Sequence, residues 1–324
     1  MSTNTVGRTW TQENLLRELE PVVEENLLRH EKVSKEWFPH EFIPWSKARD
    51  FDGLLDGEPW SPEQSTLPDV ARTSLIVNLL TEDNLPSYHH EIATVFGRDG
   101  AWGTWVHRWT AEEDRHGNAI RDYLLAARSV DPVALERARM THMMAGYQNI
   151  HGTDLLRSLA YVSFQELATR ISHRNTGKVT GDPIADQLLA RISLDENLHM
   201  LFYRNLLGAA FDLTPNQTMR AITDVVSTFE MPGSTIADFT RKSVQIAMAG
   251  IYDLRIHHDD VLRPVLRHWK VWDVEGLGAE GEQARAELDA FLEGLDDTAG
   301  RFEAKRSAHR ERQAARGRTE VIVT

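Results

Sequence analysis

The stretch Trp109-Thr110-Ala111-Glu112-Glu113-Asp114-Arg115-His116-Gly117 decides the fold of this chain. It lies within residues 102–125, where apolar residues recur at helical spacing. Glu113 and His116 interrupt that apolar stripe at positions i and i+3, so both fall on the buried face of the helix, one turn apart. A carboxylate and an imidazole on a buried face are costly unless something pairs with them. The stretch therefore predicts a polar site inside a helical core.

A second Glu-x-x-His motif has the same placement. Glu196 and His199 interrupt the apolar stripe of residues 188–206. About thirty residues before each motif a further glutamate interrupts an apolar helical stripe, Glu82 in the first case and Glu166 in the second. Two such motifs alone would prove little, because Glu and His are common in this chain. Their matched placement, each with a glutamate about thirty residues earlier, indicates that two halves of the helical core have the same arrangement of these residues.

Turns lie about midway between the paired glutamates, near residues 97–100 and 175–183. In an antiparallel helix pair, two residues that are equally far from the turn in sequence lie at the same height, here ~22 Å from the turn. Each half then offers one Glu and one Glu-x-x-His pair at one level. Four carboxylates and two imidazoles in one bundle core are the ligand set of di-iron and di-manganese carboxylate proteins. The predicted metal ligands are Glu82, Glu113, His116, Glu166, Glu196 and His199.

The pattern predicts an all-α fold, a ferritin-like four-helix bundle with a di-iron core plus additional helices. Pro86 is expected to kink a helix beside the first ligand, because proline removes a helical hydrogen bond. We expect one domain over residues 1–324, with an N-terminal helix and strap (1–68), the di-iron bundle (69–210), additional helices (211–300) and a basic C-terminal tail (301–324). Helices are predicted at about 9–35, 69–96, 101–128, 132–149, 152–175, 182–210, 215–229, 235–253, 256–269 and 279–309.

Composition limits the function classes. The 324 residues include no cysteine, which excludes disulfides, thiolate ligands and an iron–sulfur cluster held by the chain itself. Electrons used at a metal site would have to come from another protein. The net charge of −13 argues against nucleic acid as the main partner. The sequence has no apolar run of about 18 residues that could span a membrane, and residues 1–8 lack the apolar stretch of a signal peptide. A cytoplasmic location is expected.

Mixed carboxylate and imidazole ligands suit iron, with manganese as a possible substitute, so two Fe²⁺ ions per chain are predicted. Glu112 and Asp195 directly precede the ligand glutamates, and each is expected to accept the second ring N–H of a ligand histidine; ordinary surface acids are the alternative. Thr169 could turn its hydroxyl to the metal site or bond back to its own helix. The pairs His89-His90 and His257-His258 are interpreted as surface or structural histidines.

Several segments resemble the soluble acyl-acyl-carrier-protein desaturases, the plant stearoyl-type enzymes and their actinobacterial relatives. Around the predicted ligands these segments are LTEDNLP (80–86), WTAEEDRHG (109–117), SFQELAT (163–169) with ISH (171–173), and DENLH (195–199). WFPHEFIP (37–44) resembles the N-terminal strap of that family, and RHWKV (267–271) with GLGAEGEQA (276–284) resembles its C-terminal region. The similarity covers nearly the whole chain in the same order.

The resemblance implies a homodimeric helical enzyme with a di-iron centre that inserts a cis double bond into a saturated acyl chain on acyl carrier protein, in fatty acid biosynthesis. It implies O2 as the oxidant and ferredoxin as the electron donor. The family's ligands correspond to the six predicted residues, its oxygen-activating threonine to Thr169, and its electron route to Trp37, His116 and Asp195. The connection between the first two ligand glutamates is shorter than in plant enzymes, so chain length and double-bond position stay open.

Three other interpretations use similar ligands. An iron-storage or iron-oxidising bundle is commonly much shorter and lacks the helices expected after about residue 210. The radical subunit of a ribonucleotide reductase would need a tyrosine close to a ligand, and Tyr123 is a poor match. A carrier-protein-binding paralogue with little catalysis has the same sequence features as an active desaturase.

Docking of the carrier protein is expected to depend on charge. Acyl carrier protein is acidic, and so is this chain as a whole, so the contact must use a local basic patch. The candidates are Arg263, Arg267, Lys270 and the basic stretch 301–318.

Overall fold

The computed structural model describes residues 9–147 and 149–322, and in these ranges the chain is almost entirely helical. Over the same ranges the β pairing is limited to an isolated bridge between Phe51 and Glu58, which confirms the all-α prediction. None of the helices described is long and apolar enough to cross a bilayer. The α-helices are α1 (Gln12–Val33), α2 (Asp69–Asp83), α3 (Leu85–Phe96), α4 (Gly100–Ala126), α5 (Pro132–Ala145), α6 (Leu155–Thr180), α7 (Pro183–Leu213), α8 (Pro215–Ser227), α9 (Phe239–Ala249), α10 (Leu254–Ile256), α11 (Arg263–His268) and α12 (Ala279–Ile322).

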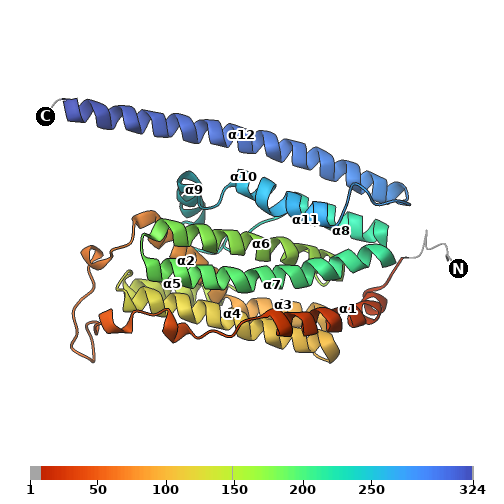
Figure 1. The fold of residues 1–324 in the computed structure, drawn as a ribbon, viewed down its shortest axis with the longest axis horizontal. Coiled ribbons are helices and arrows are strands. Elements are labelled where there is room, and N and C mark those ends of the chain that lie inside the picture. Colours follow the sequence, from red (N-terminus) through yellow and green to blue (C-terminus); the bar gives the residue numbers. More distant parts are fainter. Residues whose placement is uncertain (1–8, 148, 323–324) are drawn as a thin grey trace.

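Helices α2 with α3, α4, α6 and α7 form a ferritin-like four-helix bundle, as predicted (Figure 1). Helix α1 lies along α4 and α7. On the opposite side α8 and α11 form a further layer, and the long α12 runs over them (Figure 1). A non-helical strap follows α1, with short 3₁₀ turns at Pro39–Glu41 and Trp45–Lys47. The extra layer covers part of α6 and α7, and the strap lies against α4.

The turn between α6 and α7 is tighter than the loop predicted at 175–183. Helix α6 continues to Thr180 and ends at Gly181, whose φ of 68° lies in the left-handed region that favours glycine. The side chain of Asp182 caps α7 by accepting hydrogen bonds from backbone N–H groups in the first turn of that helix. Glu166 and Glu196 are almost equally far from this turn in sequence, so the two glutamates face each other at one level.

The helix predicted at 69–96 is two helices, separated at Asn84. Helix α2 ends at Asp83, and Pro86 lies in the first turn of α3. Proline is accepted in a first turn, where its missing N–H would be unpaired anyway, but it disrupts the interior of a helix. The expected kink is therefore a full break, and it lies directly after the predicted ligand Glu82.

The C-terminal helices also differ from the prediction. The helix expected at 256–269 is α10, a π-helical turn at His257–Leu262 and α11. Helix α12 does not end near 309 but continues through the basic stretch to Ile322. Arg306 and Arg310 donate hydrogen bonds to the backbone oxygens of Ala247 and Met248 on α9, so α12 is attached to the rest of the molecule well beyond its apolar part.

Two large apolar blocks lie on either side of a polar layer, and a smaller third cluster, with Leu80 of α2 and Ile246 of α9, packs these two helices together. One block contains Trp102, Trp105 and Trp109 with residues of α1, α6, α7 and α8. The other contains Ile120, Leu188 and neighbouring residues of α2, α4 and α7. The interruptions in the apolar stripes lie between these blocks.

Two leucines of α7 test this core. Leu188→Ala removes a side chain with 0% exposure and is expected to lower the free energy of unfolding by ~2–5 kcal/mol. Leu194 is 56% exposed, and Leu194→Ala should change it by less than about 0.5 kcal/mol. Urea unfolding followed by circular dichroism measures both values. Equal effects of the two substitutions would contradict the assigned core.

Candidate metal centre

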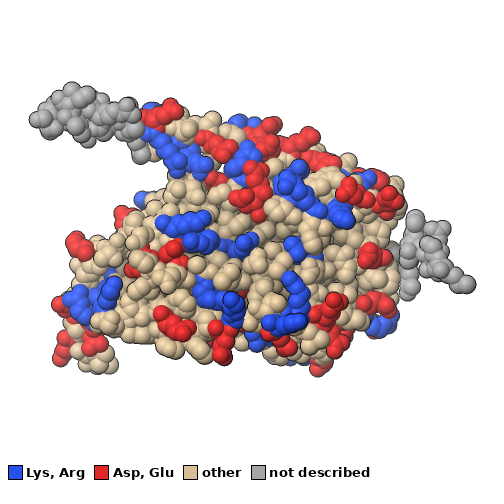
Figure 2. Space-filling view, in the orientation of Figure 1, with Lys and Arg blue, Asp and Glu red and all other residues tan. Residues whose placement is uncertain are grey.

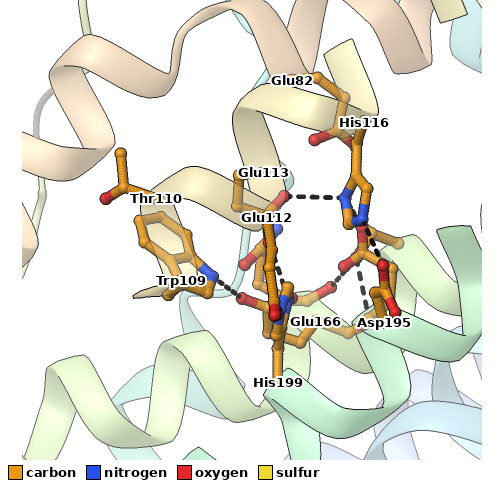
Figure 3. Close-up of polar contacts among 12 residues, drawn as sticks. Glu82, Trp109, Thr110, Glu112, Glu113, His116, Glu166, Asp195 and His199 are labelled. Carbon is orange, nitrogen blue, oxygen red and sulfur yellow. Dashed lines mark hydrogen bonds and ion pairs between the residues drawn. The ribbon is translucent and has the colours of Figure 1, made fainter. Parts of the chain in front are cut away.

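The six predicted ligands meet in the polar layer between the two apolar blocks. Figure 3 labels Glu82, Glu113, His116, Glu166 and His199. All are buried; the most exposed of them, Glu82, retains 8% of its accessible surface. Their ligand atoms form two groups, each within 4.8 Å: Glu82, Glu113, His116 and Glu196 in the first, and Glu113, Glu166, Glu196 and His199 in the second. Because Glu113 and Glu196 belong to both groups, their carboxylates lie between the two halves of the site.

Four buried atoms of the second group have no hydrogen-bond partner among the described residues. They are Oε1 of Glu113, Oε2 of Glu166, Oε1 of Glu196 and Nδ1 of His199. Nδ1 of His199 lies 2.8 Å from Oε1 of Glu113 and 3.6 Å from Oε2 of Glu166, but neither contact is a hydrogen bond. Buried polar atoms without partners are rare in proteins. Oxygen and nitrogen atoms gathered in this way fit the binding of cations.

Charge balance leads to the same conclusion. Burial, followed by the charge of Glu113, raises the pKa values of Glu82 and Glu166 well above the usual range for a carboxyl group. Burial would also raise the pKa of Glu113, but His199 and His116 outweigh it and hold that pKa below its usual range. Protons compete for the same oxygens as a metal ion. Two divalent cations would balance all four carboxylates.

Each acid that directly precedes a ligand glutamate of a Glu-x-x-His motif contacts the histidine of the other motif, on the other helix. Nε2 of His199 on α7 lies 2.8 Å from Oε2 of Glu112 on α4. Nε2 of His116 on α4 lies 3.4 Å from Oδ2 of Asp195 on α7. A carboxylate only accepts hydrogen bonds, so each ring donates through Nε2 and turns Nδ1 toward the centre. The structure places each acid beside the histidine of the other helix.

The strap contributes a buried tryptophan to the site. Nε1 of Trp37 donates a 2.7 Å hydrogen bond to Asp195. The indole ring stacks on His116 with 6.3 Å between centroids and 17° between planes, and Arg115 lies over its face, 4.5 Å from the ring centroid. The structure thus brings together Trp37, Asp195 and His116, the three residues that the family resemblance connects.

Thr169 combines both interpretations that the sequence left open. Its hydroxyl lies 3.0 Å from the backbone oxygen of Glu166 and 2.8 Å from Oε2 of Glu196. A hydroxyl has one proton, so it donates to one of these acceptors at a time. The side chain therefore reaches the centre without leaving its own helix.

Sequence analysis missed three buried contacts of the centre. His30, on α1, places Nε2 3.0 Å from Oε2 of Glu112. His173, on α6, places Nε2 2.9 Å from Oε1 of Glu82, and burial lowers its pKa to about 4. Trp109 donates from Nε1 to Oε1 of Glu166, at 3.0 Å (Figure 3). His30 and His173 are polar residues on the buried faces of their helices, so the search for interrupted stripes could have found them, whereas Trp109 belongs to the apolar stripe itself.

The two histidine pairs lie outside the centre, as predicted. His89 is half-buried and pairs with Thr110, with 2.8 Å between Nδ1 and the hydroxyl oxygen, while His90 is exposed. His257 and His258 are buried, and burial lowers the pKa of His257 to about 4. These two side chains are structural.

A cavity that is partly open to solvent adjoins the metal centre. Glu82, Glu113 and Thr169 line its inner end. From Thr169 it follows α6 back to Ser158, a distance of about 16 Å at the rise of an α-helix. Apolar side chains form much of its wall, among them Leu85, Ile92, Val95, Trp109 and Val162.

A second cavity, also partly open to solvent, extends the other way along α6 toward His173. Thr81, Thr169 and Pro232 line both cavities, so the two meet beside the centre. Helix α9 forms part of the outer wall of the second cavity through Phe239, Ser243 and Ile246. The site is therefore reached by two narrow spaces that run in opposite directions.

Fold and site together define the class. A four-helix bundle with buried Glu and His side chains from all four helices, in two groups that share two carboxylates, is a ferritin-like protein of the di-metal carboxylate type.

Comparisons with known proteins identify the family within that class. The family model for fatty acid desaturases matches residues 11–322. DesA1 of Mycobacterium tuberculosis, whose name assigns it provisionally to the acyl-[acyl-carrier-protein] desaturases, is 51% identical over 315 residues, covering 95% of this chain and 93% of that protein. The chloroplastic stearoyl-[acyl-carrier-protein] 9-desaturase 5 of Oryza sativa subsp. japonica is 31% identical over 294 residues, covering 85% and 72%. The X-ray structure of DesA2 from M. tuberculosis H37Rv superposes with a TM-score of 0.68 at 30% identity, covering 83% of this chain and 98% of that one.

This chain belongs to the acyl-[acyl-carrier-protein] desaturase family of oxidoreductases. The matches extend through the C-terminal helices, which favours this family over an iron-storage bundle or a reductase radical subunit.

Metal analysis tests the six residues. Glu113→Ala and His199→Ala are each expected to abolish binding of at least one metal ion per chain, because each removes a ligand from a closed buried set. Asp114→Ala, a neighbouring exposed acid, should retain the wild-type content. Elemental analysis gives the metal content, and circular dichroism checks that the helices persist. Full metal content in both ligand variants would contradict the assignment.

Proposed function

We propose that the protein inserts a cis double bond into a saturated fatty acyl chain carried on acyl carrier protein, using O2 and electrons from ferredoxin. The family assignment supports the reaction class. The observation that carries the proposal is the apolar cavity whose inner end is formed by Glu82, Glu113 and Thr169. A hydrocarbon chain in that cavity would have its carbons beside the metal ligands.

The six buried side chains would hold two iron ions, which supply, when bound, an oxidant strong enough to remove hydrogen from an unactivated methylene. The overall reaction removes two hydrogen atoms from the acyl chain. With two electrons and two protons, it converts O2 to two water molecules. The chain has no cysteine for a cluster of its own, which supports an external protein as electron donor.

The protein's own contribution is to position the substrate. All methylenes of an acyl chain are chemically alike, so only geometry can select one pair of carbons. Two cavities that meet at Thr81, Thr169 and Pro232 would fix which carbons lie at the centre, by the length of chain that each cavity accepts. Their buried walls would also exclude water from the reacting atoms.

Trp37, Asp195 and His116 are proposed to form the route by which electrons reach the centre. Trp37 is joined to Asp195 by a hydrogen bond and to His116 by ring stacking. Thr169 is proposed to orient the Glu196 carboxylate and the reacting groups through its 2.8 Å hydrogen bond. By the same family resemblance, we propose that the active form is a homodimer.

The docking site for acyl carrier protein is proposed to lie at α9 and the C-terminal part of α12. Arg241 is exposed on α9, which lines the second cavity, and Arg310 attaches the basic stretch of α12 to the same helix. Figure 2 shows basic side chains on the underside of the C-terminal part of α12, where the helix overhangs a hollow in the surface. Of the predicted candidates, the 301–318 stretch contacts α9 through Arg306 and Arg310, which favours it over Arg263, Arg267 and Lys270.

Turnover is tested with the iron-loaded protein, reduced ferredoxin, O2 and a saturated acyl carrier protein, with mass spectrometry of the fatty acids. The wild type should give a cis-monoene. Thr169→Ala should keep both irons but lower turnover roughly fivefold, since one hydrogen bond of ~1 kcal/mol is lost. Thr169→Ser keeps the hydroxyl and should stay close to wild type. If the wild type forms no monoene, and the acyl carrier protein does not accelerate O2 consumption, the chain is a non-catalytic paralogue.

Docking is tested by the salt dependence of carrier-protein binding. Affinity should fall as ionic strength rises, because attraction between exposed opposite charges is screened. Arg241→Glu combined with Arg310→Glu should raise the Kd by roughly tenfold, ~1.4 kcal/mol. Arg267→Glu, an exposed arginine on α11, is the matched control and should change the Kd little. A Kd that is independent of salt, or a larger effect of Arg267→Glu, would contradict the proposed site.

A further inference from the structure

The surroundings of His116 follow a simple plan. Its Nε2 faces Asp195, and that acid is also held by Arg191, one turn earlier on the same helix. Trp37 completes the arrangement, because it donates a hydrogen bond from its ring N–H to Asp195 while its ring stacks on His116. One aromatic ring therefore holds both the acid and the histidine that the acid orients.

The surroundings of His199 repeat these three contacts, with an acid, an arginine and a stacked ring. Its Nε2 faces Glu112, and that acid is held at 2.5 Å by Arg108, one turn earlier on the same helix. The place of the tryptophan is taken by His30. Nε2 of His30 lies 3.0 Å from Oε2 of Glu112, and its ring stacks on His199 with 5.9 Å between centroids and 23° between planes.

We infer that His30 is the counterpart of Trp37 in the second half of the site. It is a positioning residue that fixes Glu112 and, through it, His199, and tight binding of the metal ion beside Glu166 and His199 depends on it. The inference rests on the ligand assignment proposed above and adds a residue that lies outside the predicted set.

The location of His30 is suited to this role. It lies in the last turn of α1, 3% exposed, and continues the buried stripe of Leu19, Val23 and Leu27. The edge of its ring also packs against Trp105, at 5.0 Å and 83°. Helix α1 contacts both α4, which carries Glu112, and α7, which carries His199. The imidazole therefore cannot turn away without disturbing the packing of α1 on both helices.

The ring N–H of His30 matters because Glu112 is a buried carboxylate. It accepts hydrogen bonds from His199, His30 and Arg108, and although burial would raise its pKa, the bonds from His199 and His30 keep that pKa far below the usual range. Without the N–H of His30, the acid would lose a buried donor and its fixed orientation. The N–H of His199 would then be held less firmly, and a ligating imidazole depends on that bond for its orientation.

Two substitutions of His30 test separately whether its ring N–H or the shape of its ring is required. His30→Phe keeps a ring that can stack on His199 but has no donor, whereas His30→Gln keeps a neutral N–H donor without the ring. Metal-free protein is titrated with Fe²⁺ under anaerobic conditions, or with Co²⁺, in competition with a chelator, to obtain the affinities of both ions. His257→Phe is the matched control, because His257 is also buried and hydrogen-bonded, to Tyr252, but does not touch the centre.

In His30→Phe, one of the two ions should bind on the order of 10–100-fold more weakly, as when other partners of ligating histidines are removed. The other ion should bind as in the wild type. His30→Gln should recover most of the lost affinity, and His257→Phe should bind both ions normally. Wild-type affinity for both ions in His30→Phe would overturn the inference, and so would equal weakening of both ions in His30→Phe and His257→Phe. A wild type that binds no pair of ions would instead overturn the ligand assignment, and the role of His30 with it.

Discussion

The structure depends on one constraint, the cost of four carboxylates in the core of a helical bundle. Glu82, Glu113, Glu166 and Glu196 are all nearly inaccessible to water. Ionised groups in such a place are tolerated only when opposite charge and hydrogen bonds surround them. Within the protein, His116 and His199 contact the carboxylates, and Glu112 and Asp195, each held by an arginine, orient these histidines. Two divalent cations would supply the remaining positive charge.

The centre could be predicted because its buried polar residues interrupt the apolar stripes of their helices. A polar residue in an apolar helical stripe is rare without a reason, and the six predicted ligands all interrupt such stripes at matched distances from turns. Helix periodicity and the turn positions are local properties, so they can be read without a structure. Placing Trp37 against Asp195 and His116 was different, because the strap has no periodicity, and only the family resemblance connected these residues.

Other features could not be predicted from local pattern. The prediction of a kink at Pro86 was right in position but wrong in degree, since whether a helix bends or breaks depends on the packing around it. The length of α12 is set partly by contacts of Arg306 and Arg310 with α9, which are far away in sequence. His30 is a different case. It lies near the end of a helix that was predicted, but its place on the buried face of that helix was not considered.

The exchange of acids between α4 and α7 has a consequence for biosynthesis. Glu112 and His199 are 87 residues apart in sequence, and the ribosome completes α4 long before α7 emerges. Until then His116 lacks its acid, and Glu113 lacks the imidazole of His199. A nascent chain cannot assemble either half of the centre by itself. Metal binding at the complete centre would therefore follow the docking of both helical hairpins.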